Sequence, residues 1–117
     1  MIRIDSHHHV HTDWVVYRAL KPLAKQYGFT SMRLSATLHK VGLPMRVYKY
    51  LLNRDIRANF GTTDEFDGFY PSVVTAAKSG RSVELMVHPL YSSSGELLDS
   101  SSPYENLIST LTLDLNL

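Results

Sequence analysis

The sequence predicts an α/β fold in which mainly parallel strands alternate with crossover helices. Short runs of β-branched and apolar residues alternate along the chain with segments whose apolar residues recur every three or four positions. Glycine or proline stands at most of the borders between them. This order is typical of a parallel sheet with helices on its faces. With 117 residues and no internal repeat or linker, we expect one domain spanning residues 1–117.

Composition excludes several classes of protein. Twelve basic and eleven acidic residues leave a net charge of +1, which gives no electrostatic reason to expect nucleic acid or a membrane surface as a partner. The chain has no cysteine, so disulfides and thiolate metal sites are excluded. No apolar run approaches the length of about 20 residues that spans a membrane. The N-terminus is polar by residue 5 and predicts no signal peptide, so we expect a cytoplasmic protein.

The first predicted element is a strand over residues 2–6 that runs into four histidines. On an extended backbone, Arg3, Asp5, His7 and His9 share one face. Imidazole nitrogen and carboxylate oxygen are common ligands of divalent metals, so Asp5, His7 and His9 are candidate ligands. Two other interpretations stand beside this one: a purification tag, and histidines that only donate or accept hydrogen bonds.

A helix is predicted from Asp13, a suitable N-cap, to about Tyr27, with Gly28 in the left-handed position after its end. Pro22 should kink or divide it. The expected apolar stripe consists of Val16, Leu20, Leu23 and Tyr27.

A second strand is predicted over residues 30–35, with Arg33 in its later half, and a second helix begins at Gly42 with Pro44 in its first turn. The apolar stripe of this helix is Tyr48, Leu52, Ile56 and Phe60, supported by Met45 and Leu51. Its basic residues are Arg46, Lys49, Arg54 and Arg57, and a solvated helix face explains them better than a nucleic-acid site.

The remaining elements follow the same alternation. Residues 61–69 form a short strand or a loop, and their acids, Asp64, Glu65 and Asp67, are expected to be exposed rather than to bind metal. A helix is predicted over residues 71–78 and a strand over residues 82–89. Pro89 should stop that strand just after His88. Then come a polar loop over residues 92–102, a helix over residues 103–111 that starts with a capping box, and a leucine-rich tail to residue 117.

In parallel α/β folds, functional groups gather at the C-terminal ends of the strands. Asp5 and His7 follow the first predicted strand, and His88 ends a later one. We therefore expect His7 and His88 to face a common cleft.

Three segments resemble the YdjC-like carbohydrate deacetylases. Residues 4–11 (IDSHHHVH) are similar to the histidine-rich strand end of that family. Residues 23–29 (LAKQYGF) and 32–34 (MRL) resemble its next helix and arginine-bearing strand, and residues 83–89 (VELMVHP) its late strand ending in His-Pro. The resemblance implies a distorted β/α barrel that removes N-acetyl groups from small sugars with a divalent metal ion of the Mg or Zn type.

The resemblance also implies roles for particular residues. His7 would be a metal ligand, and His88 the proton donor or a group that stabilises the intermediate. Arg33 would contact substrate or orient a carboxylate. Asp5 could substitute for the general base, because the family's Ala-Asp-Asp motif and its second metal histidine have no counterpart in this sequence. The chain thus resembles only the C-terminal half of the barrel, which predicts a homo-oligomer or a partner chain that supplies the missing half.

Two other functions remain open. The Ile-Asp-x-His-x-His opening also resembles amidohydrolases and PHP-type phosphoesterases, in which His7 and His9 would both bind metal. Alternatively, the chain is a non-enzymatic split or remnant domain that self-associates.

Overall fold

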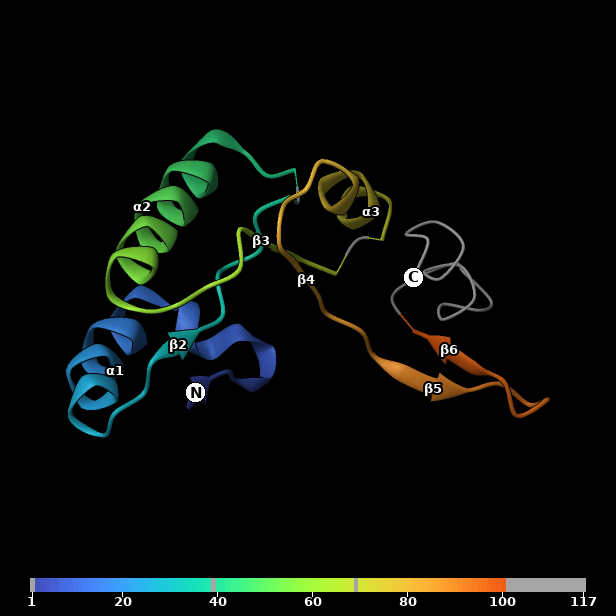
Figure 1. Cartoon of the computed structure of the whole chain (residues 1–117), viewed down its shortest axis with the longest axis horizontal. Coiled ribbons are helices and arrows are strands. Elements are labelled where there is room, and N and C mark those ends of the chain that lie inside the picture. The colour runs from blue at the N-terminus through green and yellow to red at the C-terminus, as the bar shows by residue number, and fades with distance from the viewer. Residues whose placement is uncertain (1, 39, 69, 101–117) are drawn as a thin grey trace. The chain divides into compact units, whose positions relative to one another are not determined.

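The structure, a computed structural model, describes residues 2–38, 40–68 and 70–100. The chain divides into two compact units, Met1–Thr63 and Asp64–Leu117, called here the N-terminal and C-terminal units. Figure 1 shows the helices and strands of both units. Among the described residues, no helix has both the length and the apolar character needed to cross a membrane.

The N-terminal unit pairs two short parallel strands through a helical crossover. Its elements are β1 (Arg3–Ile4), the 3-10 helix η1 (His7–Thr12), α1 (Trp14–Gln26), β2 (Ser31–Met32) and α2 (Leu43–Asn59). In the register of β1 and β2, Arg3 lies opposite Ser31 and Ile4 opposite Met32. The core of this unit is Ile4, Tyr17, Ala24, Met32, Leu34, Leu52, Ile56 and Phe60, all buried.

The ends of α1 are as the sequence predicts. The Asp13 carboxylate accepts hydrogen bonds from the amides of Val15 and Val16, at 2.9 and 3.2 Å, which satisfies donors that the first turn leaves without helical partners. Gly28 follows the helix with a φ of +75°. Of the two expectations for Pro22, a kink or a division of the helix, the division is wrong, because α1 runs through Pro22 without interruption.

The predicted apolar stripe of α1 was wrong. Val16, Leu23 and Tyr27 are 37, 50 and 69% exposed, whereas Tyr17 and Ala24 are each only 1% exposed. The buried face therefore lies about 100° away, the rotation of one residue along a helix. The Tyr17 hydroxyl donates a hydrogen bond to the Asp55 carboxylate of α2 at 2.5 Å, and this contact between the two helices fixes the rotation of α1.

The prediction for α2 is confirmed in its main features. Gly42 caps the helix, Pro44 lies in its first turn, and Leu52, Ile56 and Phe60 of the stripe are buried. The two supporting residues were wrongly assigned: Met45 is 47% exposed and Leu51 is 51% exposed.

The C-terminal unit contains β3 (Glu65–Asp67), α3 (Tyr70–Lys78), β4 (Val83–Leu85), β5 (Pro89–Tyr91) and β6 (Leu97–Asp99). Strands β3 and β4 are parallel and α3 connects them, while β5 and β6 are antiparallel. The expectation of exposed acids was wrong for Glu65 and Asp67, which are 5 and 4% exposed. Glu65 forms an ion pair with Arg81, and charged groups are rarely buried unless they are paired.

The single strand predicted over residues 82–89 was also wrong. Strand β4 ends at Leu85, and Pro89 begins β5 instead of ending a strand. The predicted polar loop contains β6 and the turn that joins it to β5, where Gly95 has a φ of +84°. The helix predicted over residues 103–111 and the leucine-rich tail lie outside the described residues.

Candidate functional site

The histidine run is a tight turn and does not continue β1. The strand ends at Ile4, and the chain coils from His7 to Thr12 with His8 and His9 at φ values of +53° and +58°. The prediction that Asp5, His7 and His9 share one strand face was therefore wrong. Positive φ is uncommon for residues other than glycine, although histidine adopts it more often than most.

Ser6 and His11 close this turn. The Ser6 Oγ accepts a hydrogen bond from the His11 amide at 3.0 Å and lies 2.6 Å from the His11 Nδ1. The His11 Nε2 lies 3.0 Å from the backbone carbonyl oxygen of Arg33. Because a carbonyl can only accept, Nε2 carries the proton, and Nδ1 of the neutral ring accepts from the Ser6 hydroxyl. Both ring nitrogens are thus used within the protein.

The environment of His11 keeps its ring neutral. The side chain is 1% exposed. Burial lowers its pKa below 6.5, because the charged ring loses hydration there, and this outweighs the opposing effect of the hydrogen bond to the Arg33 carbonyl. His11 is therefore a structural residue that connects η1 to the segment after β2.

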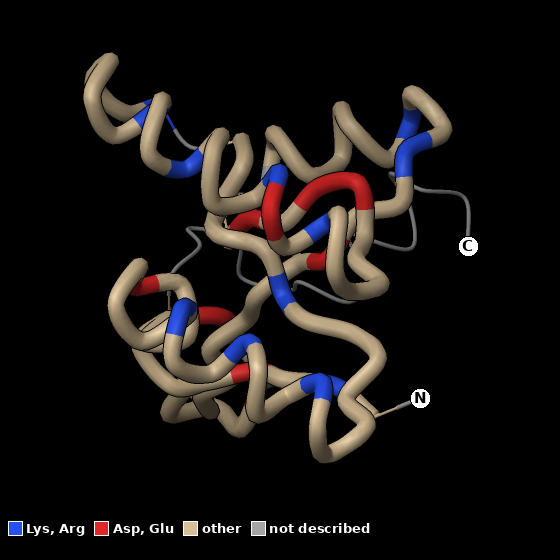
Figure 2. Tube along the Cα trace, turned by 90° about the vertical axis from the view of Figure 1, so that its left-hand side faces the viewer, with Lys and Arg blue, Asp and Glu red and all other residues tan. Residues whose placement is uncertain are grey.

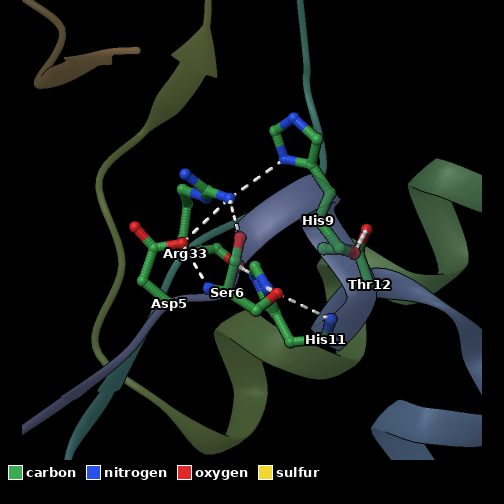
Figure 3. A network of polar contacts seen from close by, with 6 residues as sticks. All are labelled: Asp5, Ser6, His9, His11, Thr12 and Arg33. Atoms are coloured by element: carbon green, nitrogen blue, oxygen red, sulfur yellow. Dashed lines mark hydrogen bonds and ion pairs between the residues drawn. The ribbon is translucent and has the colours of Figure 1, made fainter. Parts of the chain in front are cut away.

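Arg33, only 7% exposed, holds the end of β1 (Figure 3). Its Nη2 donates to the Ser6 carbonyl oxygen at 3.0 Å and lies 3.1 Å from the His9 Nδ1. The same nitrogen forms an ion pair with the Asp5 Oδ1 at 2.8 Å. Asp5, Ser6 and His9 are thus fixed around one guanidinium, called here the Arg33 cluster. Of the sequence-predicted site residues, it contains Asp5, His9 and Arg33.

The contact with Arg33 determines the protonation of His9. A guanidinium only donates, so the His9 Nδ1 must accept, and the proton of the neutral ring is on Nε2. Burial lowers the pKa of His9 below 6.5, and the nearby positive charge of Arg33 lowers it further. His9 cannot bind a metal through Nδ1 while this contact exists.

Asp5 and His7 remain partly or fully exposed. The Asp5 side chain is 50% exposed, and its Oδ1 also accepts the Ser6 amide at 2.6 Å. The exposed His7 ring lies against that of His8, with 3.8 Å between ring centroids. In the ranges 2–38, 40–68 and 70–100, no three His, Asp or Glu side chains are grouped closely enough to hold a metal ion. The described residues therefore do not form a complete divalent-metal site.

His88 lies in the C-terminal unit, exposed and directly before β5. Its amide donates to the Asp99 carboxylate at 2.8 Å, and its carbonyl accepts from the Ser100 amide at 3.0 Å. These bonds fix the backbone of His88. Whether His7 and His88 face a common cleft stays a prediction, because they belong to separate units.

Sequence reasoning missed two polar groups that organise the N-terminal unit. The first group is the pair Ser6 and His11. Their spacing of five residues matches neither strand nor helix periodicity, so no sequence pattern indicated it. The other links α1 to α2: Tyr17 and Lys21 both donate to the Asp55 Oδ2, at 2.5 and 2.8 Å. Hydrogen bonds from Lys21 and Tyr17 lower the pKa of Asp55, and burial raises the pKa of Tyr17.

The Arg33 cluster holds the Asp5 carboxylate in a fixed orientation, through the Arg33 Nη2 and the Ser6 amide. The Asp5 carboxylate could contribute to a cation site, and the exposed His7 imidazole could bind a metal. No protein-family model, curated protein or solved structure matches this chain significantly.

Proposed function

We propose that this chain is a metal-dependent carbohydrate deacetylase-like protein that supplies part of a divalent-metal site. Asp5 and His7 are its contribution to that site, and the other ligands come from a second copy or a partner chain. The substrate class is a small N-acetylated sugar. The support comes from the three sequence segments that resemble YdjC-like deacetylases and from the geometry around Arg33.

The observation that carries the proposal is the Arg33 cluster. Arg33 follows β2, pairs with the Asp5 carboxylate after β1, and the two strands are parallel. Residues from the C-terminal ends of adjacent parallel strands are thus held together, as is common for α/β active sites. In this proposal Arg33 orients the Asp5 carboxylate, His7 is a metal ligand, and His88 is the candidate proton donor.

Metal content and acetate release test this proposal. Purified protein would be incubated with a divalent metal and dialysed, its metal measured by mass spectrometry, and acetate release measured with a chitooligosaccharide. The His7→Ala variant should lose both bound metal and acetate release. His8→Ala is the matched control, because His8 is exposed in the same turn, and it should keep both. Wild-type protein that neither retains metal nor releases acetate would overturn the proposal.

A non-enzymatic split domain is the second candidate, favoured by a specific observation. His11 uses both ring nitrogens in internal hydrogen bonds, and the His9 Nδ1 contacts Arg33, so half of the histidine run has a structural role. The amidohydrolase-like alternative requires His7 and His9 together on the metal, and the contact from Arg33 to the His9 Nδ1 counts against it. Metal binding that depends equally on His7 and His9 would support that alternative instead.

A further inference from the structure

The net charge of +1 conceals a separation of charge between the two units. Residues 1–63 contain ten Lys and Arg against three Asp and Glu, a formal charge of +7. Residues 64–117 contain two Lys and Arg against eight Asp and Glu, a formal charge of −6. Figure 2 marks the described charged positions along the trace. A charge of this size on a small unit repels itself and attracts a surface of opposite sign.

The outward side of α2 carries an exposed stripe that is apolar at its start and basic at its end. Its residues follow spacings of four, three, four and three, which places them on one helix face. They are Leu43, Val47, Tyr50, Arg54 and Arg57, all exposed, and together they are called here the α2 stripe. Leu43 and Tyr50 are 70 and 65% exposed. The buried residues Leu52 and Ile56 lie on the opposite side of the helix.

Within α2, the basic residues outnumber the acidic ones. Asp55, the one acid in the sequence of α2, accepts hydrogen bonds from Tyr17 and Lys21 of α1. The stripe therefore combines large apolar side chains with arginines. Tyrosine and arginine are enriched at protein–protein interfaces and in their energetically dominant positions.

We propose that the α2 stripe docks the acidic C-terminal unit of a second copy of this chain, reciprocally, in a two-fold dimer. Charge complementarity identifies the occupant: the stripe lies on the unit of charge +7, and the same chain supplies a unit of charge −6. Each contact brings a basic unit against an acidic one, and a two-fold dimer forms this contact twice. Leu43, Val47 and Tyr50 favour a protein surface over a polyanion, because phosphate groups offer them no apolar contact.

Sedimentation equilibrium of the wild-type chain tests the proposal directly. The screening length falls from about 10 Å at 0.1 M salt to about 3 Å at 1 M, so the dimer dissociation constant should rise about tenfold or more over that range. Wild-type protein that remains monomeric at the lower salt concentration, at about 100 µM protein, would overturn the proposal. That outcome would instead fit a contact within one chain or an unrelated anionic partner.

Charge-reversal variants locate the interface. Arg54→Glu with Arg57→Glu should weaken the dimer at least tenfold. Arg18→Glu with Lys40→Glu is the matched control, because both side chains are exposed in the N-terminal unit outside α2 and the change in net charge is the same. The control should retain most of the association. If both double variants weaken the dimer equally, the weakening comes from the change in net charge alone. That result would overturn the assignment of the interface to the α2 stripe.

A mixing experiment tests the reciprocal arrangement. Glu84→Lys with Glu96→Lys, both in the C-terminal unit, should also weaken self-association at least tenfold. Mixed in equal amounts with the Arg54→Glu/Arg57→Glu variant, it should form a heterodimer, because one contact is unchanged and the other has both charges reversed. Failure of the mixture to associate would overturn the proposal. Circular dichroism checks that each variant is folded, and the salt series on wild-type protein does not depend on any variant.

Discussion

Replacing Ser6 with alanine should destabilise the N-terminal unit well beyond the effect of an ordinary surface substitution. The Ser6 hydroxyl is the partner of two groups of His11, the backbone amide at 3.0 Å and the Nδ1 at 2.6 Å. A buried polar group that loses its partner costs about 1–3 kcal/mol. Both bonds are only partly buried, so water replaces part of them, and we expect a loss of about 2 kcal/mol for the pair.

Urea unfolding followed by tryptophan fluorescence measures this loss. Trp14 is the single tryptophan of the chain and begins α1, so its signal reports on the N-terminal unit. With a denaturant slope of about 1–2 kcal/mol per M, the midpoint should fall by about 1–2 M. Ser6→Thr keeps the hydroxyl and should lose less.

Ser93→Ala is the control, because Ser93 is exposed in the turn between β5 and β6. Its effect should stay within about 0.5 kcal/mol. A Ser6→Ala midpoint that differs from wild type no more than the control would refute the argument that the Ser6–His11 link supports the turn.

Two further predictions concern the same unit. Because the pKa values of His9 and His11 are lowered below 6.5 in the folded protein, folding favours the neutral rings. The free energy of unfolding should therefore be fully retained above pH 6.5 and fall as the pH drops through the lowered values. Urea midpoints from Trp14 fluorescence check this, and a midpoint that increases on acidification would contradict it. Asp13→Ala removes the N-cap of α1 and should cost about 1 kcal/mol in the same assay; an unchanged midpoint would show that water caps the helix equally well.

Helix boundaries could be predicted from the sequence because local chemistry determines them. Asp13 and Gly28 mark the ends of α1, and Gly42 and Pro44 mark the start of α2, through hydrogen bonds and backbone angles that involve only near neighbours. Part of the buried face of α2 was also predictable, because Leu52, Ile56 and Phe60 recur every four residues, about one helical turn.

The face of α1 was not predictable in this way. Apolar residues occupy several sides of that helix, so periodicity allowed more than one choice. The bond from Tyr17 to Asp55, 38 residues away, selected the buried side. The burial of Glu65 was unpredictable for the same reason, because it accompanies an ion pair with Arg81, a residue that is distant in the sequence.

In the candidate site, too, the sequence indicated the residue types, and only tertiary contacts decided their partners. The residue types at the end of β1 already indicated polar chemistry at Asp5 and His7, since their ionisable groups do not depend on the fold. Which histidine nitrogens remain available was decided only by tertiary contacts. Alternation along a strand placed His9 beside His7, but hydrogen bonds between Ser6 and His11 coil the chain, and Arg33 occupies the His9 Nδ1. A side chain's chemistry is local, whereas its partners come from segments that only folding brings together.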